Sequence, residues 1–318
     1  VNAPIRSLDD ERNHLFRDYL RVAKQLRPKF ILIENVPGII SLGRGTVVEK
    51  IYEELAEIGY KVDHRILFAG HYGVPQTRFR TIIIACQDGY ELRFPEPEYY
   101  AEARANFGGA KNLVYKLSPM FSSHLKPATT VDDAVSDLPP IEGGVSKVLH
   151  SYYSEPKSEY QRLLRVAKAE QVFNHHCSKL GKINKQRLQF IPQGGSWRDI
   201  PHDLLPKGLQ RARRSDHTKR YGRLHPEGMC STILTKCDPH WGSFFHPTQD
   251  RVISVREAAR IQSFPDSFKF TGSLTQQYEQ VGNAVPPMMA KAIGTCIKDS
   301  IEAYDEKQQQ RKKEIVNA

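Results

Sequence analysis

The sequence predicts an α/β fold followed by a second, irregular domain, and two observations support this. In the first ninety residues, short apolar runs typical of buried strands alternate with segments whose apolar residues recur at helical spacing. From about Gln87 to His246 this periodicity weakens, and proline, glycine and basic residues dominate. Strands that alternate with helices form a sheet with helices packed on its faces, so we expect one such sheet and then a loop-rich domain.

The first predicted strand, Phe30–Ile33, stops at the carboxylate of Glu34, and Pro37-Gly38 ends it. Four consecutive apolar residues of this kind are typical of a buried parallel strand. Ligands of open α/β sheets bind outside the carboxyl ends of the strands, so Glu34 is placed to face a functional site. The alternative is a glutamate that caps the following loop.

The other elements of this domain surround that strand. Helices are predicted from Glu11 and over Val47–Ile58, and strands over Lys61–Phe68 and Thr81–Ala85. Gly59 is placed to end the second helix.

Two arginines lie just before the last of these strands. Arg78 and Arg80 are two residues apart, so extended backbone would put both side chains on one face. There they could meet a phosphate or a base carbonyl. The alternative is a pair of surface arginines.

Charge favours a polyanionic partner. The 318 residues include 46 Lys and Arg against 36 Asp and Glu, which gives a formal net charge of +10. Hydrophobic residues make up 39%, which is ordinary for a globular protein and excludes wholesale disorder. Nucleic acid is the partner that this excess of positive charge favours.

The irregular domain contains the candidate nucleic-acid contacts. Basic residues gather between Lys207 and Arg223, and aromatic residues surround this run at Tyr221, Trp241, Phe244 and Phe245. A solvated basic face is the alternative, but the global excess of positive charge favours contact with nucleic acid. The predicted contacts are Arg211, Arg213, Arg214, Lys219, Thr232 and Lys236.

The cysteines predict reduced thiols in an intracellular protein, because their number is odd and their spacing irregular. They are Cys86, Cys177, Cys230, Cys237 and Cys296. A metal site at Cys230 and Cys237 with His240 and His246 is an alternative. No Cys-x-x-Cys pair accompanies them, so ordinary packing is preferred and no metal is predicted.

No signal peptide and no apolar run long enough to span a bilayer is found in the sequence. We therefore expect a soluble protein that stays inside the cell, cytoplasmic and associated with the nucleoid, or nuclear in a eukaryote.

Regular structure returns after the irregular domain. In Arg251–Pro265, Ser254 and Glu257 form a capping-box pattern at the start of a helix that Phe264-Pro265 closes. A last helix is predicted from about Met288 to Tyr304, and the charged tail from Glu306 is expected to fray.

Four of these segments together resemble the DNA (cytosine-5)-methyltransferase family. They occur in the family's order and span nearly the whole chain: Glu34-Asn35-Val36, Gln76-Thr77-Arg78-Phe79-Arg80, Arg251–Pro265 and Gly282-Asn283-Ala284-Val285-Pro286-Pro287. Each is weak alone, but four in order are highly specific. The resemblance implies a Rossmann-like methyltransferase sheet with a smaller, irregular target recognition domain.

Two motifs of the family's amino-terminal half are absent from the sequence. One is the Phe-x-Gly-x-Gly loop for S-adenosylmethionine, and the other is the Pro-Cys-Gln loop whose cysteine attacks the base. The resemblance therefore implies the distal part of a methyltransferase, with the amino-terminal strands of its sheet missing. It would be a subunit of a split enzyme or one segment of a longer chain.

The resemblance also implies an order of domains. Residues 1–90 would form the distal part of the catalytic domain and 91–250 the target recognition domain. Residues 251–272 would brace that domain, and the C-terminal helix in 273–318 would return to the catalytic domain.

By resemblance, Glu34 is the acid that accepts from the cytosine N4 amino group and protonates or hydrogen-bonds N3, provided burial raises its pKa. Arg80, with Arg78 beside it, would donate to O2 and help to hold the flipped nucleotide. Asn283 and Ala284 would close the S-adenosylmethionine pocket, although a simple tight turn is the alternative for Gly282-Asn283. The nucleophilic thiolate is expected from the missing half.

The implied partners are double-stranded DNA and a chain or segment that supplies the two absent motifs. Pairing with a restriction nuclease is the expected biological setting. One alternative is an RNA cytosine methyltransferase, but the length of the recognition region favours duplex DNA. The other is a non-catalytic DNA-binding or stimulatory subunit, which the retention of Glu34, Arg78 and Arg80 argues against.

Overall fold

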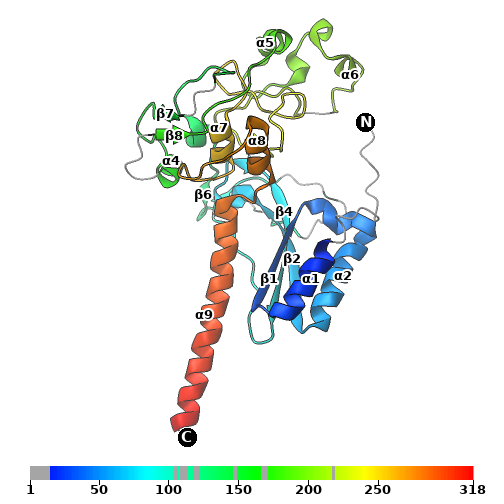
Figure 1. Ribbon diagram of the computed structural model, residues 1–318, viewed down its shortest axis with the longest axis vertical. Coiled ribbons are helices and arrows are strands. Elements are labelled where there is room, and N and C mark those ends of the chain that lie inside the picture. The colour runs from blue at the N-terminus through cyan, green and yellow to red at the C-terminus, as the bar shows by residue number, and fades with distance from the viewer. Residues whose placement is uncertain are drawn as a thin grey trace.

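The protein forms two lobes joined by helix α9 and by short connections (Figure 1). The structure is a computed structural model that describes residues 15–103, 107, 113–115, 117, 122–145, 149–165, 171–216 and 219–317. One lobe contains a three-stranded sheet with helices on both faces. The other is built from short helices, small ladders and irregular loops, as the sequence predicts.

The sheet has the strand order β1-β4-β2. Strands β1 (Phe30–Asn35), β2 (Tyr60–Phe68) and β4 (Phe79–Gln87) match the three predicted strands within about two residues. Strand β4 runs antiparallel to both neighbours. The expectation that the Glu34 strand is a buried parallel strand is therefore wrong for the neighbour that the structure describes. The chain reverses between β2 and β4 through a short connection and inserts β4 beside β1.

Helices cover the two faces of the sheet. Helices α1 (Leu15–Leu26) and α2 (Thr46–Glu57) pack on one face, where Leu20 and Ile51 belong to the same core as Ile83. Helix α9 packs on the other face, where Ile293 and Ile82 share a core. Gly59 has a φ of +85° and ends α2, as predicted. The part of the predicted first helix before Leu15 lies outside the described residues.

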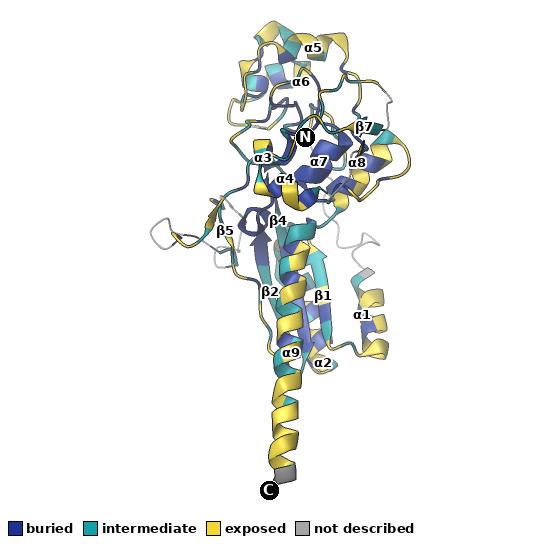
Figure 2. Ribbon diagram, turned by 90° about the vertical axis from the view of Figure 1, so that its left-hand side faces the viewer, coloured by how far each residue is buried: buried dark blue, intermediate teal, exposed yellow. Residues whose placement is uncertain are grey.

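Helix α9 runs over Pro287–Asn317, much further than predicted. The expectation that the tail frays from Glu306 is wrong, because residues with good helix propensity continue the helix. Its last turns are exposed and extend beyond the sheet (Figure 2). No helix within the described ranges has the length and the apolar character that crossing a membrane requires.

The remaining elements are short. The 3-10 helices are η2 (Pro37–Gly45), η3 (Ala69–Tyr72), η5 (Trp197–Asp199) and η6 (His202–Leu204). The helices of the second lobe are α3 (Val131–Val135), α4 (Glu159–Leu164), α5 (Lys182–Leu188), α6 (Lys207–Gln210), α7 (Val255–Ile261) and α8 (Leu274–Asn283). The short strands are β3 (Gln76–Thr77), β5 (Tyr99–Tyr100), β6 (Lys126–Pro127), β7 (Leu149–Ser151), β8 (Gln171–Phe173) and β9 (Cys230–Ser231).

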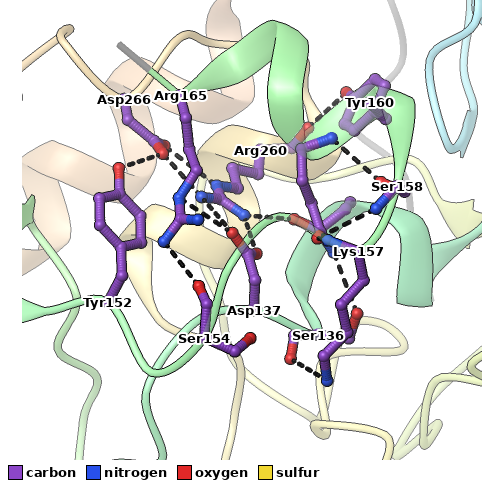
Figure 3. A network of polar contacts seen from close by, with 12 residues as sticks. Ser136, Asp137, Tyr152, Ser154, Lys157, Ser158, Tyr160, Arg165, Arg260 and Asp266 are labelled. Carbon is purple, nitrogen blue, oxygen red and sulfur yellow. Dashed lines mark hydrogen bonds and ion pairs between the residues drawn. The ribbon is translucent and has the colours of Figure 1, made fainter. Parts of the chain in front are cut away.

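Helix α7 lies at the centre of the second lobe and is buried along its whole length. Arg260 on this helix is fully buried and pairs with Asp137, and its Nη2 lies 2.7 Å from Oδ2 of Asp266 (Figure 3). Tyr152 donates to the same carboxylate, and Tyr160 donates to the Arg260 carbonyl. Burial alone would lower the pKa of Arg260, but the hydrogen bonds and charges of Asp266 and Asp137 outweigh it and raise the pKa. This network ties α7 to the segments around α3 and α4.

The start of α7 is fixed by Ser254 and Glu257, which form the predicted capping box. Glu257 also accepts two hydrogen bonds of 2.7 Å from the guanidinium of Arg251. The hydroxyl of Ser254 has a second partner in His175, whose Nδ1 lies 2.8 Å from it. The other ring nitrogen of His175 donates to the carbonyl of Pro139 at 2.7 Å. A neutral imidazole satisfies both contacts.

The neutral state of His175 predicts a pH-dependent stability. Burial, the largest cause, lowers the pKa of His175 to about 4, whereas an unfolded histidine titrates near about 6.5. Between these values only the unfolded chain binds the proton. Above about pH 6.5 His175 is neutral in both states, and the free energy of unfolding does not depend on its protonation. As pH falls from about 6.5 toward 4, this free energy decreases by about 1.4 kcal/mol per pH unit.

We expect His175→Gln to make the free energy of unfolding less dependent on pH in this range. The slope should decrease by about 1.4 kcal/mol per pH unit, which corresponds to one bound proton. The measurement is urea denaturation between pH 4.5 and 7.5, with His202→Gln, at an exposed histidine, as the matched control. A His175→Gln slope equal to that of wild type would contradict the assignment.

Candidate active site

Glu34 and Arg80 form an ion pair at the carboxyl end of β1. Glu34 lies opposite Ile82 in the ladder with β4, and Arg80 is the second residue of β4. The Arg80 Nε lies 2.6 Å from Glu34 Oε1, and the two side chains are 12% and 29% exposed. Burial lowers the pKa of Arg80, and the charge and hydrogen bond of Glu34 oppose that shift. The structure thus brings together an acid and a cation at a partly exposed strand end.

Arg78 is fully buried beside this pair. Its Nη1 donates to the carbonyl of Ile233 at 3.2 Å, and its Nη2 donates to the carbonyls of Gly282 and Ala284 at 2.8 and 2.9 Å. Burial and the charge of Arg80 lower the pKa of Arg78 to about 9, while Glu34 opposes the shift. The guanidinium therefore stays charged at neutral pH and binds the second lobe.

Arg78 and Arg80 consequently differ in what they contact, although the sequence predicts that both meet the same ligand. Arg80 is partly exposed and pairs with Glu34, whereas the Arg78 donors point into the protein. The prediction that both meet a ligand is not supported for Arg78. Its carbonyl partners lie about 155 and 204 residues further along the chain, which the local sequence does not reveal.

Two glutamines complete this contact between the lobes, which we call the interlobe junction: Gln76, Arg78, Gln262 and the carbonyls that they bind. Gln76 Nε2 donates to Gln262 Oε1 at 2.5 Å, and Gln76 Oε1 accepts from the Ile233 amide at 3.0 Å. Gln262 Nε2 donates to the Ala284 carbonyl at 2.7 Å. Both glutamines are fully buried. Glutamine is mostly exposed in proteins, so the sequence alone does not identify them.

The junction sits beside a short parallel ladder. Strand β3 pairs with β9, with Gln76 opposite Cys230. Thr232, predicted to bind nucleic acid, donates its hydroxyl to the Thr77 carbonyl at 2.8 Å. The segment that follows β9 is therefore attached to the chain only a few residues before Arg80.

The predicted cofactor residues end helix α8 rather than forming a tight turn. Gly282 and Asn283 are the last helical residues, and Ala284 is the C-cap. Asn283 is exposed, whereas the Ala284 carbonyl accepts from both Arg78 and Gln262.

The other predicted nucleic-acid contacts lie on the surface of the second lobe. Arg211, Arg213 and Arg214 follow α6 and are exposed, as are Lys219 and Lys236. The structure therefore places five of the six predicted contacts in solvent and Thr232 against β3.

The sequence matches the family model described as C-5 cytosine-specific DNA methylase over residues 5–299. The chain belongs to this family. It is 36% identical to "DNA (cytosine-5)-methyltransferase 1B" of Oryza sativa subsp. japonica, over 90% of this chain and 20% of that protein. It is 32% identical to "DNA (cytosine-5)-methyltransferase 1" of Gallus gallus, over 94% of this chain and 23% of that protein. The chain spans about a fifth of the length of these curated relatives.

A solved structure supports the fold of this family member. The chain is similar to a putative DNA modification methyltransferase encoded within a prophage of E. coli, with a TM-score of 0.66 and 22% sequence identity over 92% of this chain and 76% of that one. The family and the Rossmann-like methyltransferase fold implied by the sequence motifs are thus confirmed.

Gly282 provides a direct test of the interlobe junction. A Cβ added there would lie 2.5 Å from the carbonyl carbon and oxygen of Leu234 and 2.6 Å from the Thr235 nitrogen. Since backbone atoms cannot move away as a side chain can, we expect Gly282→Ala to lower the free energy of unfolding by about 1–3 kcal/mol.

Gly294→Ala is the matched control, because it is also a helical glycine and an added Cβ there meets nothing within 4 Å. We expect it to stabilise the protein by about 0.5–1 kcal/mol. Urea denaturation of both variants checks the prediction, and equal stability changes would contradict the close approach at Gly282.

Proposed function

We propose that this chain supplies the acid and the target recognition lobe of a DNA cytosine-5 methyltransferase. The enzyme would transfer a methyl group from S-adenosylmethionine to C5 of a flipped cytosine in a specific DNA sequence. The observation that carries this proposal is the Glu34–Arg80 pair at the end of β1, in a chain of the C-5 cytosine-specific DNA methylase family.

The chemistry explains why this pair is needed. Cytosine C5 is a poor nucleophile until a group adds to C6, and that addition places negative charge on the ring at N3. Glu34 Oε1 contacts Arg80, so we assign Oε2 to the Watson-Crick edge of the base. There the carboxyl group in its protonated form donates its proton to N3 as negative charge develops, and it accepts a hydrogen bond from N4. Arg80 then donates to O2 and orients the carboxyl group. The base must leave the DNA stack to reach these groups.

We assign Arg78 to positioning rather than to substrate contact. Its hydrogen bonds to Ile233 and Gly282 hold the recognition lobe against the strand end that carries Arg80.

The thiols of this chain do not suit the role of nucleophile. Cys86, Cys177 and Cys230 are buried, and all five cysteines are free. Burial raises the pKa of Cys177 to about 11 and of Cys230 to about 12, and it also raises the pKa of Cys86, Cys237 and Cys296. The thiolate is the reactive form, so a thiol held protonated at neutral pH reacts slowly.

Across the described part of the chain, no cluster of His, Cys, Asp and Glu is arranged to hold a metal ion.

We therefore propose that a complementary segment, joined to this chain or separate from it, supplies the Pro-Cys-Gln and Phe-x-Gly-x-Gly loops. Strand β1 borders the described sheet, and Leu32 on it is exposed. Such an edge is a template for a further strand. A strand that runs parallel to β1 on this edge would bring its own carboxyl end next to Glu34, where the nucleophile is needed.

One side of the cofactor pocket would come from this chain. The exposed amide of Asn283 is available to a ligand, which fits this role. Ala284 would contribute packing alone, because its carbonyl and amide both have partners within the chain. S-adenosylmethionine would supply the methyl group, and the glycine-rich loop of the complementary segment would supply its main contacts.

Double-stranded DNA is the proposed substrate, with phosphate contacts from Arg211, Arg213, Arg214, Lys219 and Lys236. The protein would work wherever its DNA is held, in a nucleus or a nucleoid. A non-catalytic DNA-binding subunit is the second candidate, favoured by the high pKa values of the thiols.

Glu34→Gln tests the proposal. In the complete enzyme we expect kcat to fall by about 100-fold or more, because the acid acts on charge that develops in the transition state. DNA affinity should stay within about threefold of wild type, because phosphate contacts supply most of it. The measurement is steady-state methyl transfer to DNA together with equilibrium DNA binding.

Glu302→Gln is the matched control, since this exposed glutamate pairs with Lys298 on α9. It should leave both quantities unchanged. Wild-type kcat in Glu34→Gln would remove Glu34 from the mechanism and favour the non-catalytic subunit.

A further inference from the structure

An exposed tryptophan lies among the basic residues of the recognition lobe. The chain has two tryptophans, of which Trp197 is 3% exposed and Trp241 is 51% exposed. The Cζ of Arg220 lies 5.2 Å from the centroid of the Trp241 ring, and the His240 ring packs edge-on against it at 5.0 Å. The proposed chemistry of Glu34 and Arg80 makes no use of this indole.

The loop that carries Trp241 is fixed to the basic run. The Tyr221 amide donates to the Pro239 carbonyl at 2.6 Å, and the Ser243 hydroxyl donates to the Lys219 carbonyl at 3.0 Å. Within the loop, the Trp241 amide donates to the Asp238 carbonyl at 2.9 Å. These contacts fix the backbone of the Trp241 loop before any ligand arrives, which lowers the entropy cost of binding.

The surroundings of Trp241 are positively charged. Arg220 covers part of the ring, and Lys219 and Lys236 are exposed on the segments that flank the loop. The loop also contains Asp238, whose Oδ1 accepts from the His240 amide at 2.9 Å. Leu209 of α6 shares a core with Tyr221, which places the arginines that follow α6 on the same part of the lobe.

We infer that Trp241 is a base-contacting residue of the DNA interface, with its indole held against a base while Lys219, Arg220 and Lys236 bind the flanking phosphates. This inference rests on the proposed function and names a DNA-contacting residue for it. An aromatic ring with an arginine against it and exposed lysines on the flanking segments suits a nucleic acid, since phosphates bind the cations and every base has a face for stacking. A protein partner would have to cover the same cations with carboxylates.

Fluorescence tests this inference, because Trp241 is the exposed one of only two tryptophans. In the wild-type protein, duplex DNA should reduce the quenching of tryptophan emission by acrylamide. In Trp241→Phe, DNA should leave the remaining Trp197 emission unchanged. Fluorescence anisotropy of a labelled duplex, measured in parallel, reports binding independently.

Affinity and salt dependence distinguish stacking on a base from binding to a phosphate. We expect Trp241→Ala to weaken DNA binding by about tenfold, and Trp241→Phe, which keeps an aromatic ring, to restore most of the affinity. The slope of log affinity against log salt should stay unchanged in both variants, because the indole has no charge. Arg211, Arg213 and Arg214 replaced together by Ala should lower that slope by about 0.9 for each phosphate that these arginines neutralise in the wild-type complex.

Failure of the inference and failure of the proposed function give different results. If wild type binds the labelled duplex but Trp241 stays open to acrylamide and Trp241→Ala binds equally well, the inference is overturned and the indole is left for a protein partner. If wild type does not bind DNA at all, both the inference and the proposed DNA substrate are overturned.

Discussion

The guanidinium of Arg78 is fully buried, and the carbonyls that accept its hydrogen bonds come from two separate segments of the second lobe. A buried charge is costly unless its donors are satisfied, so the structure that satisfies them is strongly favoured over one that does not. Ile233 and Gly282 therefore hold their positions relative to Arg78. Since Arg80 follows two residues later, the same interaction fixes these two segments of the second lobe relative to the Glu34–Arg80 pair.

The rest of the second lobe makes this contact rigid. Gln76 and Gln262 bind the same two segments, and the close approach of Leu234 to Gly282 leaves no room for a side chain. Behind them, Arg260 joins α7 to Asp137 and Asp266. Buried networks of this kind favour one arrangement of the chain, because each lost partner would leave a desolvated polar group. The Nε of Arg78 is buried without a hydrogen-bond partner, so its two terminal nitrogens make all of its contacts to the second lobe. The second lobe is thereby held at a fixed distance from the Glu34–Arg80 pair.

The sequence predicts the parts of this arrangement that depend on local pattern. Apolar runs and helical periodicity locate β1, β2, β4 and α2, and the Ser254–Glu257 capping box locates the start of α7. Glu34 is found because it ends an apolar strand, and Arg80 because it lies in a motif of the family resemblance. The ion pair between these two side chains is seen only in the structure.

The sequence does not predict what depends on distant segments. Arg78 and Arg80 have the same side chain and nearly the same position, and residues more than 150 positions away bind only the first of them. The direction of the strand beside β1 depends on where β4 inserts, which periodicity does not encode. The same holds for the burial of Gln76 and Gln262 and for the exposure of Trp241. Neighbours outside their own segments determine whether these side chains are buried or exposed.

Methyl transfer with and without a complementary segment tests the account most directly. Tritiated S-adenosylmethionine and duplex DNA are incubated with this chain alone, and then with a segment that contains the Phe-x-Gly-x-Gly and Pro-Cys-Gln loops. The account predicts no labelled DNA from the chain alone, labelled DNA when the segment is added, and none when the cysteine of that segment is replaced by alanine. Labelled DNA from the chain alone would contradict the account, because one of its own thiols would then have to be the nucleophile.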